Sequence, residues 1–132
     1  MRPYKVGGHR HTPEIEQELA SLGADLRISF VPHLIPLNQG ELVSCYVTGG
    51  DGTSDVRALY AEAYADEPFV EVVDGVPGVA EVRDTNYCRL AVHQDPRTNR
   101  IMVFAALDNL WKGAASQAVQ NLNLMFGRDE TE

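Results

Sequence analysis

The chain has 132 residues, 44% of them hydrophobic, and carries a formal net charge of -8. This length and composition predict one compact domain, residues 1–132, with a hydrophobic core. The acidic balance, without a basic stripe, argues against nucleic-acid binding, and no apolar run is long enough for a membrane span or a signal peptide. Cys45 and Cys88 are interpreted as reduced thiols. We therefore expect a cytoplasmic protein that binds neither nucleic acid nor membrane.

Two histidines precede the first predicted helix. Thr12 suits the N-cap, Pro13 suits the first helical position, and apolar residues at helical spacing continue up to Gly23. His9 and His11 therefore lie at the positive end of a helix dipole, which disfavours imidazolium and leaves either ring able to accept or donate a proton near pH 7. The pattern fits equally well two histidines that only cap or pack. A zinc site is disfavoured, because no third ligand accompanies them at a usual spacing.

The next part of the chain is predicted as two strands joined by a loop. Residues 26–31 alternate enough to predict a strand. Two prolines and a glycine then predict an irregular loop over residues 32–40, which either borders a site or is a plain connector. Residues 41–48 form the next predicted strand. The glycines of residues 49–52 predict a tight turn, since they lack the spacing of a phosphate-binding loop.

The middle of the chain predicts a second helix and three further strands. Thr53 or Ser54 is the predicted cap of an amphipathic helix. A short strand is predicted over residues 69–73. Residues 82–93 and 100–107 are predicted to contain the two strands of an antiparallel hairpin.

The last predicted helix covers residues 108–122 and carries three polar residues at its start. Asp108 is predicted to be a structural cap of this helix. Asn109 offers a side-chain amide to a carbonyl group or an anion, and for Asn109 and Lys112 the sequence leaves a structural and a ligand-binding role open. The acidic residues 128–132 are expected to be a frayed tail.

Four stretches together resemble a known family. They are Gly-His-Arg-His-Thr-Pro-Glu-Ile at residues 8–15, Phe-Val-Pro-His-Leu at 30–34, Thr-Asn-Tyr-Cys at 85–88 and the helix over 108–126. In order and spacing they resemble the C-terminal domain of N-acetyl-gamma-glutamyl-phosphate reductases, over nearly the whole chain. The last motif is similar to one in aspartate-semialdehyde dehydrogenases and, more loosely, in glyceraldehyde-3-phosphate dehydrogenase.

The resemblance implies a fold and an activity. The implied fold is an α+β domain with a mixed, largely antiparallel sheet and helices mainly on one face, like the catalytic domain of glyceraldehyde-3-phosphate dehydrogenase. The implied activity is the NADP-dependent reduction of a small-molecule acyl phosphate to N-acetylglutamate semialdehyde in arginine biosynthesis. An alternative is the reductase of lysine biosynthesis that acts on an aminoadipyl phosphate, because no residue here discriminates a single methylene.

The resemblance also implies roles for individual residues. By position in the motif, His11 is the first choice for the catalytic acid and base, and His9 is the second. Arg10 is suited to a carboxylate or phosphate of the substrate. Asn109 matches the asparagine that holds the nicotinamide amide in related dehydrogenases, and Lys112 is a weaker candidate for a substrate anion.

The chain departs from the family's pattern in two respects. Neither Cys45 nor Cys88 has the glycine- and proline-flanked setting of the family's nucleophilic cysteine, and the glycine-rich loop of a dinucleotide-binding domain is absent. We therefore expect an excised catalytic and dimerisation domain that is inactive alone. Gln39 stands where the family usually has arginine, which puts substrate-anion binding at this position in doubt, although its amide could still donate hydrogen bonds.

Two further expectations concern partners and rival functions. An apolar sheet face left open would be covered by a second copy, so a homo-oligomer is expected. A non-catalytic oligomerisation or regulatory module is an alternative function, supported by the absent nucleophile. A small hydrolase with a metal at His9 and His11 is a third interpretation, and no metal site is predicted.

Overall fold

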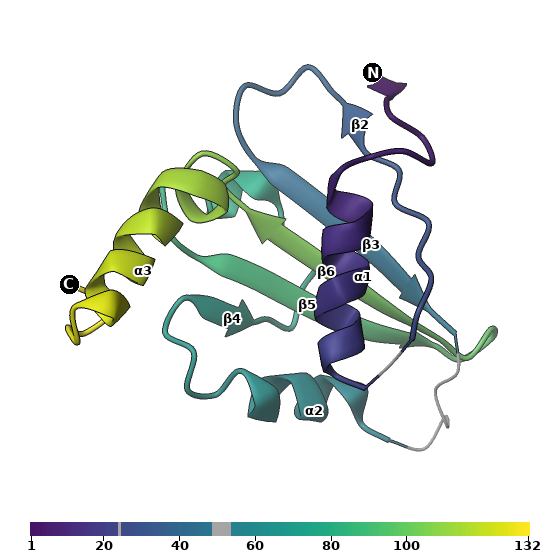
Figure 1. The fold of residues 1–132 in the computed structure, drawn as a ribbon. Coiled ribbons are helices and arrows are strands. Elements are labelled where there is room, and N and C mark those ends of the chain that lie inside the picture. Colours follow the sequence, from purple (N-terminus) through teal and green to yellow (C-terminus); the bar gives the residue numbers. More distant parts are fainter. Residues whose placement is uncertain (24, 49–53) are drawn as a thin grey trace. The chain divides into compact units, whose positions relative to one another are not determined.

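The computed structural model describes residues 1–23, 25–48 and 54–132. The chain divides into two compact units, residues 1–38 and 39–132. Each unit has a sheet of its own, two-stranded in the first and four-stranded in the second (Figure 1). Within the described part of the chain, no helix has both the length and the apolar character needed to cross a membrane.

The first unit is one helix with a short strand pair. Its elements are β1 (Arg2–Pro3), α1 (His11–Ser21) and β2 (His33–Leu34), with β1 and β2 antiparallel. The predicted strand over residues 26–31 is wrong. The carboxylate of Glu16 on α1 accepts the Ile28 backbone N–H at 3.1 Å, so that N–H bonds to a side chain and not to a neighbouring strand.

The second unit is built on a mixed, mostly antiparallel sheet. Its strands are β3 (Glu41–Val47), β4 (Val70–Val72), β5 (Cys88–Asp95) and β6 (Arg100–Leu107), in the spatial order β3-β6-β5-β4. Only the β4 and β5 pair is parallel. The predicted strands after residue 40, the hairpin and the α+β class are confirmed.

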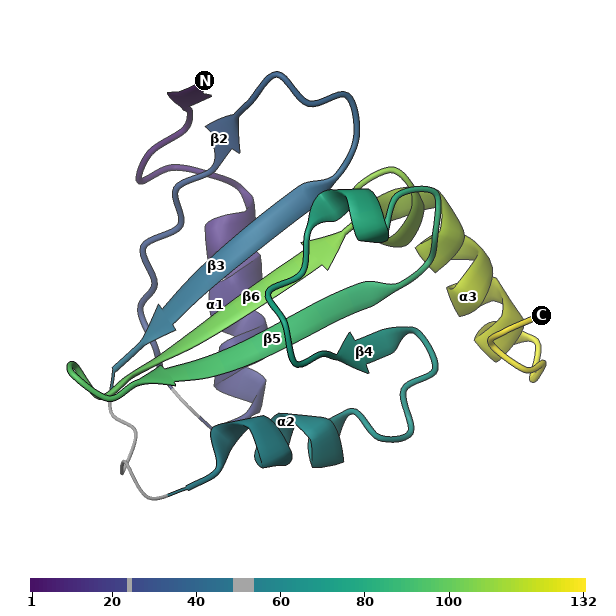
Figure 2. The ribbon, with the colours of Figure 1, turned by 180° about the vertical axis from the view of Figure 1, so that it is seen from behind.

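Helical segments fill the connections of this unit. They are α2 (Val56–Ala63), η1 (Val79–Glu81), η2 (Trp111–Ala115) and α3 (Ser116–Met125). The helix α2 packs against β5 and against the edge strand β4 (Figure 2). The hydrophobic core lies on the two central strands, β5 and β6, and on Val82 in the connection to β5. Its buried apolar residues are Val82, Leu90, Ala91, Val92, Val103 and Ala106.

The predicted cap of the second helix is corrected. Asp55 occupies the N-cap position of α2, and its side chain accepts the Ala58 N–H at 3.0 Å. The helix therefore begins after Asp55 and not directly after Ser54. Thr53 and the predicted turn over 49–52 lie outside the described residues.

The strand register brings three connections to one end of the sheet. Leu107, the last residue of β6, is paired with Glu41 of β3 on one side and with Cys88 of β5 on the other. The segment before β3, the segment before β5 and the segment after β6 therefore meet at this end. Residues far apart in sequence become neighbours there.

Candidate functional site

The first candidate cluster surrounds the start of α1. The helix begins at His11 with Arg10 at the N-cap, so the cap predicted at Thr12 is wrong. The reason is that His9 takes over the capping. Its Nδ1 accepts the backbone N–H of His11 at 3.2 Å, and its carbonyl accepts the N–H of Thr12 at 3.1 Å. Two donors of the first turn are thereby satisfied.

His9 is the buried member of this histidine cluster, which consists of Tyr4, His9, His11 and Phe30. Its exposed fraction is 8%, and the ring centroids of Tyr4, His11 and Phe30 lie 5.6, 4.7 and 5.2 Å away. Burial, and after it the nearby His11, Lys5 and Arg10, lowers the pKa of His9 below its ordinary value. Because Nδ1 accepts a backbone N–H, the proton of the neutral ring is on Nε2.

His11 is the accessible member of the histidine cluster. Its side chain is 49% exposed, and its Nε2 lies 3.9 Å from a carboxylate oxygen of Glu14. Among the described residues, neither ring nitrogen of His11 has a hydrogen-bond partner, and the exposed Arg10 has no ion pair. The His11 imidazole and the Arg10 guanidinium are thus open to a ligand, beside the His9 imidazole, which already caps the helix.

The capping role of His9 predicts a pH-dependent stability. The folded pKa lies below the ordinary value of 6.5, so the unfolded chain binds the extra proton first. The stabilisation is therefore complete above about pH 6.5 and is lost as the pH falls from there through the folded pKa. We expect His9→Asn, whose oxygen caps without titrating, to flatten this dependence in urea unfolding between pH 7 and pH 5. The same pH dependence in both proteins would contradict the capping role.

The second candidate cluster lies where the three connections meet, around Asp108. Its carboxylate is fully buried and accepts the backbone N–H groups of Asp84 at 2.7 Å, Leu110 at 2.9 Å and Trp111 at 3.0 Å. It also accepts a hydrogen bond from the amide of Gln39. Burial alone would raise the pKa of Asp108, but these donors outweigh it, and the pKa is lowered. The predicted structural cap is confirmed, since two of these N–H groups belong to Leu110 and Trp111, the N-cap residue and the first residue of η2.

Asn109 is held by Gly40. The backbone N–H of Gly40 donates to Asn109 Oδ1 at 2.6 Å. A backbone N–H can only donate, so this contact fixes which end of the amide faces Gly40. No partner is found for Asn109 Nδ2 within the described ranges. Asn109 can therefore offer a ligand the N–H groups of its amide, while its oxygen already accepts one hydrogen bond.

Gln39 has its amide group occupied. Its Nε2 donates to Asp84 Oδ1 at 2.9 Å and also to Asp108. Both hydrogens of that amide are used within the Asp108 cluster, which we define as Gln39, Gly40, Asp84, Asp108 and Asn109. The Gln39 amide has no donor left for a substrate anion in this arrangement.

The predicted continuous helix over 108–122 is wrong in its first turn. Gly113 N–H bonds to Asp108 carbonyl at 2.9 Å and Ala115 N–H to Leu110 carbonyl at 3.0 Å, which is the spacing of a π-helical turn. The side chain of Asp108 accepts the N–H groups of Leu110 and Trp111 at the start of this turn. Such turns are frequent at functional sites.

A comparison with protein-family profiles identifies the family of this chain. The profile of the family described as "Semialdehyde dehydrogenase, dimerisation domain" matches residues 1–109.

The chain belongs to this family.

Similar proteins extend the match over the remaining residues. The chain is 50% identical to the N-acetyl-gamma-glutamyl-phosphate reductase of Geobacter metallireducens and 50% identical to that of Desulforudis audaxviator. It is 52% identical to the reductase of Citrifermentans bemidjiense. Each alignment covers 99% of this chain but only 39 to 40% of the relative, so the chain spans about two fifths of the length of these relatives. The resemblance stated from the sequence motifs is confirmed.

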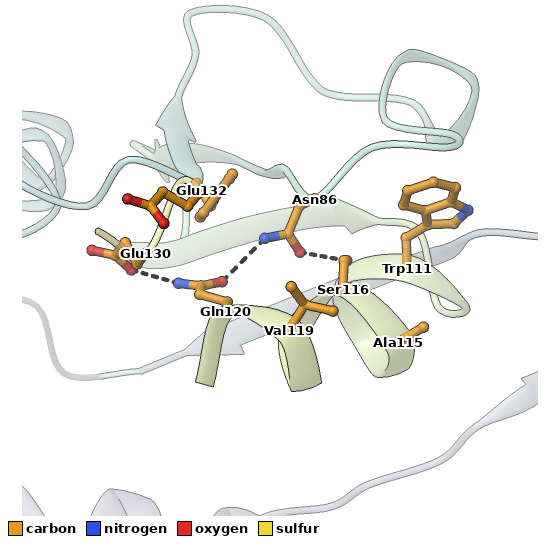
Figure 3. A pocket seen from close by; sticks show the side chains of 9 residues that line it. Asn86, Trp111, Ala115, Ser116, Val119, Gln120, Glu130 and Glu132 are labelled. Atoms are coloured by element: carbon orange, nitrogen blue, oxygen red, sulfur yellow. Dashed lines mark hydrogen bonds between the residues drawn. The ribbon is translucent and has the colours of Figure 1, made fainter. Parts of the chain in front are cut away.

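In this semialdehyde dehydrogenase dimerisation domain, Lys112 contacts a pocket wall. Its Nζ donates to Gln120 Oε1 at 2.8 Å and lies 5.3 Å from the ring centroid of Phe69, and burial lowers its pKa. Figure 3 shows the side chains around this pocket. Its volume is about 350 Å³. It is lined by Phe69, Asn86, Trp111, Ala115, Ser116, Val119, Gln120, Glu130 and Glu132. The Lys112 ammonium thus has partners inside the domain.

The acidic tail of the domain is not frayed, contrary to expectation. Gly127, with a φ of 66°, ends the helix, and the following residues fold back along α3. Gln120 Nε2 donates to Glu130 at 2.6 Å, and Asn123 Nδ2 donates to the carbonyl of Glu132 at 2.9 Å. These contacts of the tail were not predicted from the sequence, because they depend on Gln120 and Asn123, two polar residues on one face of α3.

Neither cysteine of the domain lies in a setting that favours the thiolate. Cys45 is exposed on β3, Cys88 is half-buried at the start of β5, and neither forms a disulfide. Partial burial of each sulfur raises the pKa of both thiols, which disfavours the thiolate. In the described part of the chain, no three residues of the metal-ligating types gather in one place.

Proposed function

We propose that this chain is the dimerisation-domain part of a cytoplasmic N-acetyl-gamma-glutamyl-phosphate reductase of arginine biosynthesis. The reaction converts the acyl phosphate, NADPH and a proton into N-acetylglutamate semialdehyde, inorganic phosphate and NADP⁺. The observation that carries the proposal is the arrangement at the start of α1, where His9 caps the helix and His11 is left open beside Glu14. The identity of about 50% to three reductases supports it.

The catalytic work assigned to this chain is proton transfer and substrate binding. His11 accepts and returns the proton, because it is the accessible imidazole of the cluster. His9 is the second choice, since its Nδ1 is occupied by the helix. Arg10, exposed and without an ion pair among the described residues, binds a carboxylate or phosphate of the substrate.

The part of the cofactor site assigned to this chain is Asn109. Its free Nδ2 fits the carbonyl oxygen of a nicotinamide carboxamide, which needs a donor. NADPH, when bound, supplies the hydride. We assign the pyrophosphate-binding loop and the nucleophilic cysteine to the larger part of the reductase that these relatives contain outside the matching region. This chain alone is expected to be inactive.

A homo-oligomer is part of the same proposal. Leu42 and Tyr46 point to one face of the edge strand β3 and are 54% and 64% exposed. A second copy that covers this face would remove both side chains from water. We expect analytical ultracentrifugation to find an oligomer that Leu42→Glu dissociates, and a wild-type monomer would contradict this assignment.

The test of the proposed function is a chimeric enzyme. The matching two fifths of the Geobacter metallireducens reductase is replaced by this chain, and NADPH oxidation is followed with N-acetyl-gamma-glutamyl phosphate. A second chimera on the Desulforudis audaxviator reductase controls for a poor junction, and this chain alone is the negative control. Activity of a chimera supports the proposal.

The opposite outcome favours a different function. Two chimeras that are folded, oligomeric and inactive would contradict the proposal. They would favour a non-catalytic oligomerisation module, for which the raised pKa values of Cys45 and Cys88 are the supporting observation.

A further inference from the structure

The Asp108 cluster joins three separate segments of the second unit through one carboxylate. One oxygen of Asp108 accepts the N–H groups of Leu110 and Trp111, and so caps the last helical segment. The other oxygen accepts the N–H of Asp84 and the amide of Gln39, which belong to the segments before β5 and before β3. The two oxygens thus have different tasks, one within the segment that follows β6 and one between segments.

The segment before β3 is held tightly at Gly40. Its φ is 115°, and a Cβ at this position would lie 2.8 Å from the Cβ of Val79, so the backbone packs directly on η1. The Gly40 N–H is thereby aimed at Asn109 Oδ1. The direction of the Asn109 amide therefore depends on where Gly40 lies, and Gln39, the residue before Gly40, is held by Asp108.

The charge of Asp108 has no cationic partner among the residues that the structure describes. Oriented N–H groups alone compensate it, in a fully buried position. A cap of a surface helix does not need this degree of burial or a third and fourth donor, since one or two N–H groups complete a cap. The additional donors come from the two segments that must be held together for Asn109 to be aligned.

We propose that Asp108 is a positioning residue of this domain, which holds Gln39 and Asp84 so that Gly40 directs the Asn109 amide N–H toward a ligand carbonyl. The inference rests on the proposed function for the identity of that ligand, the carboxamide of NADPH. Asp108 itself touches no ligand, and its effect on ligand binding is transmitted only by Asn109.

The test uses two isosteric variants in the chimera, with NADPH binding measured by calorimetry. Asn109→Asp keeps an oxygen for Gly40 but removes the donor, and we expect about tenfold weaker binding. Asp108→Asn keeps one oxygen for the helix cap and removes the acceptor for Asp84 and Gln39. We expect it to weaken NADPH binding about tenfold as well, with the cap retained.

A double-mutant cycle separates positioning from general stability. In an Asn109→Ala background, Asp108→Asn should change NADPH binding less than about twofold, because its effect is transmitted by Asn109. Equal losses with and without Asn109 would overturn the inference, as would unchanged binding in Asn109→Asp. Asp95→Asn, which alters a carboxylate that caps the β5–β6 turn, is the matched control and should leave binding unchanged.

A second readout does not depend on the proposed function. In the 132-residue chain alone, hydrogen exchange of the Gly40 N–H is expected to become at least tenfold faster in Asp108→Asn and to stay slow in Asn109→Asp. Slow exchange in Asp108→Asn would overturn the inference even if the chimera is active. If neither chimera binds NADPH, the proposed function fails, and this exchange measurement still decides whether Asp108 positions Gly40.

Discussion

His11→Ala is expected to lower kcat of an active chimeric reductase by about 10²- to 10⁴-fold, the usual contribution of a general acid and base. The physical reason is that His11 is the imidazole whose ring nitrogens are open, whereas the Nδ1 of His9 is bonded to the helix backbone. The affinity for NADPH should change far less, because the proposed role of His11 is proton transfer. Steady-state kinetics and calorimetry on the same preparations measure both quantities.

Two control variants accompany this prediction. His33→Ala removes another exposed imidazole, whose Nδ1 lies 3.1 Å from the Val31 carbonyl, and should leave kcat unchanged. His9→Asn keeps a cap and should retain most of kcat. A His11→Ala enzyme with normal turnover would remove the acid and base role. A larger loss in His9→Asn than in His11→Ala would move that role to His9.

The sequence predicted correctly those strands that can be recognised from their own residues and the turns beside them. Apolar alternation located β5, and strand-like runs bounded by turn residues located β3 and β6. Alternation failed as a signal over residues 26–31, where the backbone N–H of Ile28 bonds to Glu16. A tertiary contact from α1 decided the outcome, and no pattern within 26–31 announces it.

The sequence named candidate site residues one by one but not their arrangement. The motifs gave His9, His11 and Asn109 as candidates, which stay predictions, and they assigned the N-cap to Thr12, because histidine is not a usual capping residue. The sequence signalled Asp108 only as a cap. Its bonds to Gln39 and Asp84 follow from the register that pairs Leu107 with both neighbouring strands, which requires the sheet order.

Gly40→Ala is expected to lower the free energy of unfolding of the second unit by about 2–6 kcal/mol. Holding a residue with a Cβ at a φ of 115° costs about 1–3 kcal/mol, and forcing a methyl group into a packed region costs a similar amount. The methyl group cannot avoid the overlap, because the atom 2.8 Å away is the Cβ of Val79, which is fixed to the backbone of η1. Urea unfolding followed by the fluorescence of Trp111, the single tryptophan of the chain, measures this unit.

Gly75→Ala is the matched control for this substitution. Nothing lies within 4 Å of a Cβ built at Gly75, so its stability should stay within about 1 kcal/mol of the wild type. Equal stabilities for both variants would show that Gly40 is not held in its observed conformation. Because the Gly40 N–H is the group that orients Asn109, a folded Gly40→Ala protein should also bind NADPH more weakly in the chimera. The glycine before β3 therefore links the stability of the sheet end to the direction of the amide beside it.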